Sequence, residues 1–280
     1  MCNEVLGQPL SKKVKELISE VQTIFPNKQF HIGKLEDLAK ESGVRQPMQD
    51  CIAASSPAIT ECIAIWIRAD LPNEEFNAVL AEELLHHKQA YEGFPEIIDL
   101  RPRGLTYEIF TFGLEISSII CDLDAHRRME TSRINIEPLL VTDLRNLRNS
   151  ITELNASEEN LNALKDGFAK VSYFPKYLLF WFDLCELGFP KYVSAWQDEI
   201  RPWFVNVMPD TLRRWDELTT FIHNNPIIDA ESAKQAITIV FESLLSRTPI
   251  LKPRPTRGRP FASFCQSSPS PDLHQSKELP

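Results

Sequence analysis

The chain has 280 residues, of which 43% are hydrophobic and 25% are charged, proportions that are ordinary for a globular protein. Its 30 basic and 39 acidic residues leave a net charge of −9, which argues against wholesale nucleic-acid binding. No run approaches the roughly 18 apolar residues of a membrane span, and the N-terminus lacks the apolar core of a signal peptide.

The six cysteines form no Cys-x-x-Cys pair and show no regular spacing. Several lie in apolar runs, where a free thiol behaves as a small hydrophobic side chain. We therefore expect reduced thiols, a cytoplasmic location and no contact with a membrane.

The N-terminal part of the chain is expected to supply one helix and one strand. In residues 11–25, apolar side chains recur at helical spacing, which predicts an amphipathic helix. Residues 58–67 (AITECIAIWI) are rich in β-branched side chains and partly alternate, as is typical of a strand. This strand predicts a small sheet beside the helix that follows it.

A central helix is expected from Asn73 to about Gly93. Asn73 can cap it, and the acids of its first turn, Glu74 and Glu75, suit the positive end of the helix dipole. Gly93 and Pro95 supply the stop signals at its other end.

Acidic and imidazole groups gather on one side of this helix. Glu82 and His86 are one turn apart, so their side chains can converge on one point. Glu83 lies between that stripe and the apolar face, where a carboxylate without a partner is costly. Because neighbouring carboxylates repel each other, we interpret the group as a divalent-metal site. The alternative is a solvated face or a hydrogen-bonded pair of Glu and His.

The segment VLAEELLHHKQAYEGFP resembles the active-site helix of zincin metallopeptidases, in which HExxH supplies two zinc-binding histidines and a general-base glutamate. Glu82 stands where the family has its first histidine, Glu83 matches the general base, and His86 matches the second ligand. The resemblance covers roughly residues 59–131, and the ImmA/IrrE peptidases are the nearest group.

This resemblance implies a zinc-dependent hydrolase that acts on a protein or peptide. Glutamate is itself a zinc ligand, so a site with Glu82 in place of histidine is chemically reasonable. The extra negative charge would nevertheless lower the Lewis acidity of the metal. A non-catalytic, zincin-like regulatory or binding module is therefore the second interpretation.

The third ligand is expected on a long apolar helix over residues 105–129. A polar line runs along it through Glu108, Glu115, Asp122 and His126, and carboxylates on such a helix are costly unless they meet a cation. The resemblance places an acid ligand on this helix: Glu115 is the first choice, Asp122 the second and His126 the third. The alternative is a polar stripe that faces solvent or pairs with Arg127 and Arg128.

A third interpretation keeps the metal and changes the chemistry. Glu83-x-x-His86 also has the spacing of di-iron carboxylate bundles, with Glu115, Asp122 and His126 as further ligands. Such sites commonly use a second Glu-x-x-His, which the sequence lacks, so we prefer zinc.

The remaining segments predict a helical region and a tail. Helices are expected at residues 143–155, 157–172, 175–187, 191–201, 210–224 and 229–247. The expected fold is α+β and mostly helical, with a zincin-like metal-site domain (1–135), a helical region packed on it (136–247) and a disordered Pro/Ser-rich tail (248–280).

Within the tail, Arg257-Gly258-Arg259-Pro260 resembles the core of the AT-hook, which lies in a narrow A·T minor groove. We expect a solvating tail here, with DNA contact through Arg257 and Arg259 as the alternative.

Overall fold

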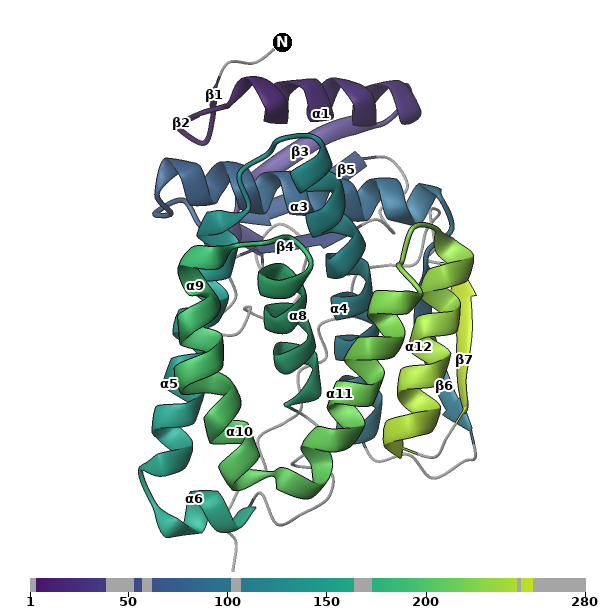
Figure 1. The fold of residues 1–280 in the computed structure, drawn as a ribbon. Helices are drawn as coiled ribbons and strands as arrows, with labels where there is room; N and C mark the ends of the chain where they lie inside the picture. The colour runs from purple at the N-terminus through teal and green to yellow at the C-terminus, as the bar shows by residue number, and fades with distance from the viewer. Residues whose placement is uncertain are drawn as a thin grey trace, which may run out of the picture.

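Two tiers of secondary structure meet along helix α3 (Asn73–Tyr91). The computed structural model describes residues 4–38, 53–56, 62–101, 107–163, 173–245 and 248–253. In Figure 1, α1 and α3 lie across the top with strands between them, and the later helices run down beneath α3. The fold is α+β and mostly helical, as the sequence predicts.

The upper tier is an α/β layer. Strand β5 is central in the order β3-β5-β4; β3 runs parallel to it and β4 antiparallel. The bounds of this tier are β1 (Glu4–Val5), β2 (Gln8–Pro9), α1 (Lys12–Ile24), β3 (Gln29–Lys34), the 3-10 turn η1 (Leu35–Asp37), β4 (Ala53–Ser56) and β5 (Cys62–Ile67). The predicted N-terminal helix and the strand preceding α3 are thus confirmed, although residues 57–61 lie outside the described part.

The central position of β5 follows from its composition. Its isoleucines, Ile63, Ile65 and Ile67, are buried against α1 and α3, whereas Ala64 and Trp66 pack on the other side against Leu35 and Leu38. A strand that buries both faces has a continuous run of hydrophobic residues in its sequence, as residues 62–67 do.

The start of α3 differs from the prediction that Asn73 caps it. The capping position is Pro72, which supplies no side-chain hydrogen bond. Asn73 is the first helical residue, and its amide donates to Gln8 Oε1 and Pro9 O at 3.2 and 2.8 Å. The helix start is therefore fixed by contacts with a preceding segment that is distant in sequence.

The lower tier is a helical assembly around an aromatic core. Trp215, Tyr177, Phe204 and Phe174 are fully buried in it. Its helices are α4 (Tyr107–Thr131), α5 (Glu137–Asn155), α6 (Glu158–Ala163), α8 (Phe174–Cys185), α9 (Pro190–Ser194), the π-helical segment η2 (Ala195–Ile200), α10 (Arg201–Val207), α11 (Pro209–Asn224) and α12 (Ala230–Leu245). The predicted helices correspond to these, except that residues 164–172 lie outside the described part.

Helix α4 joins the two tiers. Phe112, Ile116 and Ile120 pack into the aromatic core below, whereas Ala125 and Met129 pack into the core of the upper tier. The residues at the junction, 122–126, therefore face both layers, and this junction carries the candidate site.

A two-stranded ribbon forms where the sequence predicts a loop and a disordered tail. Strand β6 (Pro95–Arg101) pairs antiparallel with β7 (Thr248–Pro253), with a register irregularity between Ile97 and Asp99. The chain from 248 to 253 thus forms a strand where a disordered tail was expected. Proline is tolerated there because each strand of a two-stranded ribbon has a free edge. Arg257 to Arg259 lie outside the described residues.

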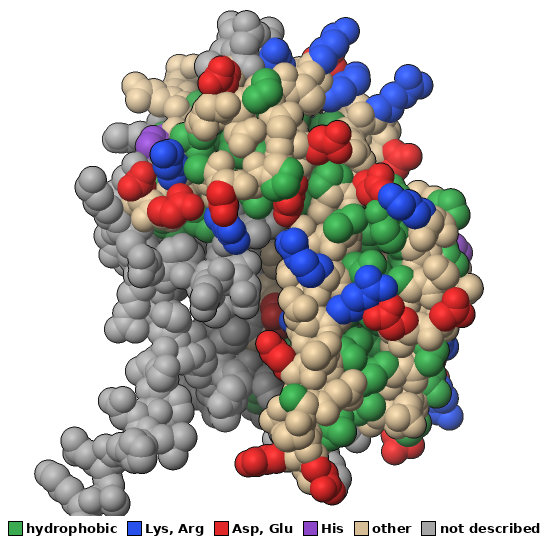
Figure 2. All heavy atoms as spheres, turned by 90° about the vertical axis from the view of Figure 1, so that its left-hand side faces the viewer, with side chains coloured by type: hydrophobic (Ala, Val, Ile, Leu, Met, Phe, Trp, Pro, Cys, Tyr) green, Lys and Arg blue, Asp and Glu red, His purple; other side chains and the backbone are tan. Residues whose placement is uncertain are grey.

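The described surface is mixed in charge. On the face shown in Figure 2, basic and acidic side chains are interspersed over hydrophobic ones.

Among the helices of the described residues, none combines the length and apolar character that a bilayer crossing requires. Among the described cysteines, Cys62, Cys121 and Cys185 form no disulfide.

Candidate metal centre

Helices α3 and α4 face each other with two acid–imidazole pairs. Glu82 and His86 are one turn apart on α3, and Asp122 and His126 are one turn apart on α4. His86 Nε2 lies 3.2 Å from Asp122 Oδ1, and His126 Nε2 lies 3.2 Å from Glu82 Oε1. The acid of each helix therefore meets the imidazole of the other.

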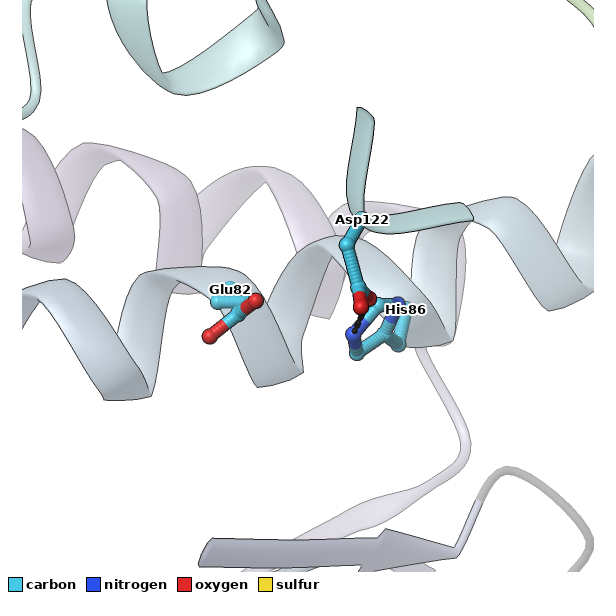
Figure 3. Close-up of side chains that lie close together, drawn as sticks. All are labelled: Glu82, His86 and Asp122. Atoms are coloured by element: carbon cyan, nitrogen blue, oxygen red, sulfur yellow. Dashed lines mark ion pairs between the residues drawn. The ribbon is translucent and has the colours of Figure 1, made fainter. Parts of the chain in front are cut away.

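Glu82, His86 and Asp122 form a group that can hold a metal ion. One ligand atom from each lies within 4.8 Å of the others, and Figure 3 shows Asp122 reaching from α4 onto His86. Ligands bound to zinc at about 2.1 Å in a tetrahedral site lie roughly 3.4 Å apart. Side-chain adjustments of roughly 1 Å would therefore close this group around one ion.

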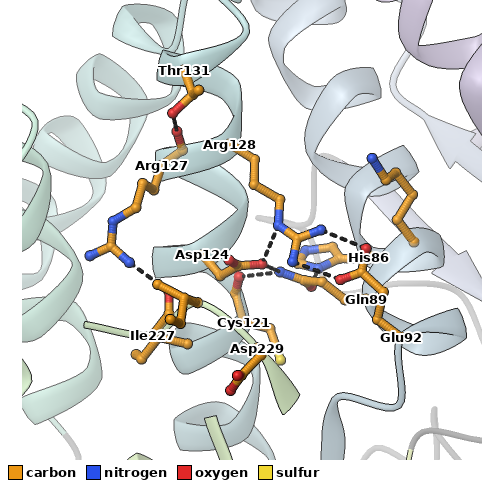
Figure 4. Close-up of polar contacts among 12 residues, drawn as sticks. His86, Gln89, Glu92, Cys121, Asp124, Arg127, Arg128, Thr131, Ile227 and Asp229 are labelled. Atoms are coloured by element: carbon orange, nitrogen blue, oxygen red, sulfur yellow. Dashed lines mark hydrogen bonds and ion pairs between the residues drawn. The ribbon is translucent and has the colours of Figure 1, made fainter. Parts of the chain in front are cut away.

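Gln89 sets the orientation of His86. The Gln89 amide nitrogen donates to Cys121 O and Asp124 Oδ2 at 2.7 and 2.9 Å, which leaves its oxygen 2.9 Å from His86 Nδ1 (Figure 4). Because that oxygen can only accept, the network assigns a proton to Nδ1 of His86. In the neutral ring, Nε2 then presents its lone pair towards Asp122, as a metal ligand does.

A clamp that is buried at Asp124 and exposed at Glu92 holds Gln89 in place. Arg128 donates to Asp124 Oδ2 at 2.7 Å and to both carboxylate oxygens of Glu92 at 2.9 and 2.7 Å (Figure 4). Burial raises the pKa of Asp124, while Gln89 and Arg128 oppose that shift. The clamp ties the last turns of α3 to α4, so the distance between the two acid–imidazole pairs is fixed by the scaffold.

His126 is held from its other side by α8. Its Nδ1 lies 2.8 Å from Asp183 Oδ1, and the two side chains are each 1% exposed. Burial opposes the charged form of His126, but Asp183 and Glu82 outweigh it and raise the pKa of the ring well above its ordinary value. Burial also opposes the ionised form of Glu82, yet His126 and His86 bring the pKa of Glu82 below its ordinary value.

Asp143 on α5 completes the electrostatic cluster. Asp143 as a whole residue is half-buried. Desolvation, followed by the negative charges of Asp183, Glu82 and Asp122, raises its pKa to about 8, with His126 opposing. At neutral pH and without a cation, Asp143 is therefore largely protonated.

The structure distinguishes among the candidates for the third ligand. It brings Asp122 into the group with Glu82 and His86, and His126 directly behind Glu82. Glu115 lies outside the group and lines a cleft of about 350 Å³ together with Asp143 and Lys176. Burial raises the pKa of Glu115, and Lys176 opposes this shift. Glu83 is half-buried and is not a member of the converging group.

Two residues of the cluster were not found from the sequence. Asp143 only begins the helix predicted at residues 143–155, and Asp183 only lies within the helix predicted at residues 175–187. Asp183 did carry a signal, because it is a lone acid in the apolar run YLLFWFDLC and must be buried wherever that helix packs.

The donor set of the site consists of carboxylates and imidazoles, which bind zinc, iron and manganese.

Comparison of the chain with family models, curated proteins and solved structures gave no match.

Proposed function

We propose that the chain is a zinc-dependent hydrolase of the peptidase type. Glu82, His86 and Asp122 hold the metal, and Glu83 is the proton acceptor. The observation that carries the proposal is the convergence of one imidazole and two carboxylates within 4.8 Å where α3 faces α4. The Nδ1 proton assigned to His86 supports it, because Nε2 is then the nitrogen that faces Asp122 and can bind a metal ion.

The surroundings of α3 suit a peptide substrate. Strand β5 precedes α3, and β4 is one of the two outer strands of the described sheet beside it. An outer strand offers unpaired backbone groups to which an extended peptide can add as a further strand. These features support the zincin resemblance of residues 59–131, which rests on the sequence.

Each side chain then has a defined task. A bound divalent cation supplies Lewis acidity, which polarises a carbonyl oxygen and makes water more acidic. Glu83 accepts the proton of the attacking water and returns it to the leaving amine. His126 donates to Glu82 and so withdraws electron density from that ligand. This hydrogen bond offsets part of the extra negative charge that Glu82 introduces in place of histidine.

Metal analysis and peptide hydrolysis test the proposal together. The purified full chain should carry zinc and cleave a mixture of quenched fluorescent peptides. His86→Ala should lose both properties, and Glu83→Gln should keep the metal but lose cleavage. His223→Ala, at an exposed histidine on α11 that pairs with Glu186, is the matched control and should change neither. Metal-free protein, or cleavage that survives Glu83→Gln, would contradict the proposal.

A second candidate, a non-catalytic binding module, is favoured by one observation. In the structure each imidazole already meets a carboxylate, so the cluster satisfies itself as two ion pairs. Glu82→His, which restores the complete HExxH, separates the two candidates. Peptidase activity that appears only in this variant would identify the natural chain as a module.

A further inference from the structure

Helix α8 buries a single acid among aromatic side chains. Asp183 is 0% exposed, and Phe180 and Phe182, which lie beside it in the sequence, are buried as well. Asp183 Oδ1 lies 2.8 Å from His126 Nδ1, whereas Oδ2 has no hydrogen-bond partner among the described residues. A buried carboxyl group with an unsatisfied oxygen costs free energy, so the fold gains little from this acid except through its contact with His126.

His126 carries this contact on to Glu82. The ring is 1% exposed and lies between two carboxyl groups, with Asp183 Oδ1 at Nδ1 and Glu82 Oε1 at Nε2, the latter 3.2 Å away. Since both oxygens act as acceptors, the contacts assign a proton to each ring nitrogen. A ring that is protonated at both nitrogens has no lone pair for a metal ion, so in this arrangement His126 is a donor to Glu82 rather than a ligand.

Two neighbouring contacts fix α8 against α4 at this point. Helix α8 packs on α4 (Figure 1), and the guanidinium carbon of Arg127 lies 5.3 Å from the ring centroid of Phe182. Arg127 and Phe182 directly adjoin His126 and Asp183 in the sequence. The Asp183 carboxyl group is therefore held by packed helices on both sides of its hydrogen bond, as a group that orients another must be.

This arrangement leaves Glu82 with one uncommitted oxygen. Oε1 meets His126, and within the described part of the chain no side chain or backbone group donates to Oε2. Glu82 also belongs to the group with His86 and Asp122 that can hold a metal ion. A catalytic zinc site has three protein ligands and keeps its fourth position for water or substrate. A carboxylate that bound through both oxygens would fill that position.

We propose that Asp183 is a positioning residue for the metal site. Through His126 it keeps Oε1 of Glu82 engaged, so that Glu82 binds the metal ion through Oε2 alone. One coordination position then stays open for water. This inference rests on the proposed function, in which Glu82, His86 and Asp122 hold the ion, and it assigns the open position to the influence of a residue on α8.

Cobalt substitution in the full chain tests this role. Co²⁺ occupies zinc sites, and its visible absorption is stronger in a four-coordinate site than in a five-coordinate one. We expect strong absorption in the natural protein and in Asp183→Asn, whose amide oxygen can still accept from His126 Nδ1. Asp183→Leu should lose most of this absorption, because His126 is then no longer fixed and both oxygens of Glu82 can reach the ion.

Asp216→Asn is the matched control. Asp216 is also an acid that holds other side chains, since it accepts from Tyr177 Oη and from Arg201, each at 2.7 Å, but it does not belong to the metal-holding group. Its replacement should lower the melting temperature and leave the cobalt spectrum unchanged. An unchanged spectrum in Asp183→Leu would refute the inference and leave the proposed function standing. A natural protein that binds neither Co²⁺ nor zinc would refute both.

A measurement on the natural protein covers the case in which Asp183→Leu does not fold. Two-dimensional ¹H–¹⁵N NMR of the zinc-loaded protein with ¹⁵N-labelled histidine reports the protons on each imidazole ring. We expect His126 to be protonated at both ring nitrogens and His86 at Nδ1 alone. A His126 Nε2 that carries no proton, or that binds the ion, would overturn the inference, because Glu82 would then lack its donor.

Discussion

At the scale of single residues, the raised pKa of Asp143 makes the stability of the metal-free protein depend on pH. Its pKa is 3.8 in an unperturbed chain and about 8 in the folded protein, so the folded state binds the proton more tightly. The contribution of this group to the stability of the metal-free protein is therefore full below pH 3.8. It is lost progressively as the pH rises towards 8.

Replacing Asp143 by asparagine should remove that pH dependence. In the presence of a chelator at pH 8, Asp143→Asn should raise the free energy of unfolding by about 2–5 kcal/mol, because position 143 then carries no carboxyl group that must ionise beside the other acids of the cluster. The difference from the natural protein should shrink as the pH falls towards 4. Urea unfolding at several pH values measures it, and a variant that is less stable at pH 8 would contradict this explanation.

At the scale of elements, Gln89 both joins α3 to α4 and orients His86. Gln89 is fully buried and connects His86 to the clamp of Asp124 and Arg128. The same hydrogen bonds that join the helices thus set which nitrogen of His86 faces the metal position. Stability and metal affinity are therefore coupled at Gln89.

The variant Gln89→Leu should weaken both properties. It leaves His86 Nδ1 without its acceptor and removes one donor to Asp124, which should cost about 1–3 kcal/mol of stability. Loss of the partner that orients His86 should lower zinc affinity by roughly 10–100-fold in a chelator competition titration. Glu92→Gln, at the exposed end of the clamp, is the control and should cost less than about 1 kcal/mol. Unchanged zinc affinity in Gln89→Leu would show that the orientation of His86 does not depend on Gln89.

The other end of α3 depends on Asn77 rather than on a capping side chain. Asn77 donates to Pro9 O and Asn73 O at 3.1 and 2.8 Å and accepts from Ser11 N at 2.8 Å. Asn77→Ala should therefore cost about 1–3 kcal/mol in urea unfolding, since these buried groups lose their partner. Unchanged stability in Asn77→Ala would argue against this role.

At the scale of the whole molecule, the ribbon of β6 and β7 joins segments that lie far apart in the sequence. Its strands precede α4 and follow α12, and α12 packs on α4. The ribbon therefore links the ends of two neighbouring helices of the lower tier.

Truncation should show what the ribbon contributes. A chain that ends at Leu245 loses β7 and leaves β6 without its partner strand, so it should melt at a lower temperature and aggregate more readily than a chain ending at Pro253. Light scattering during thermal unfolding measures both effects, and identical melting of the two chains would contradict the expectation.

How much the sequence predicts depends on the range of the interaction concerned. Helices α1, α3 and α4 follow from local periodicity, and so does the pairing of Glu82 with His86 on one face. The choice between Glu115 and Asp122 as the third ligand does not follow from local periodicity, because both residues lie on one face of α4. Only the point at which α4 crosses α3 determines which of the two lies beside His86. Asp183 and β7 depend on partners in distant parts of the chain, which no local pattern indicates.

Anomalous diffraction at the zinc absorption edge, on crystals of the protein grown with zinc, tests the central claim most directly. The account predicts a peak between α3 and α4, about 2.0–2.2 Å from ligand atoms of Glu82, His86 and Asp122. Absence of any peak at this position in zinc-saturated crystals would contradict it.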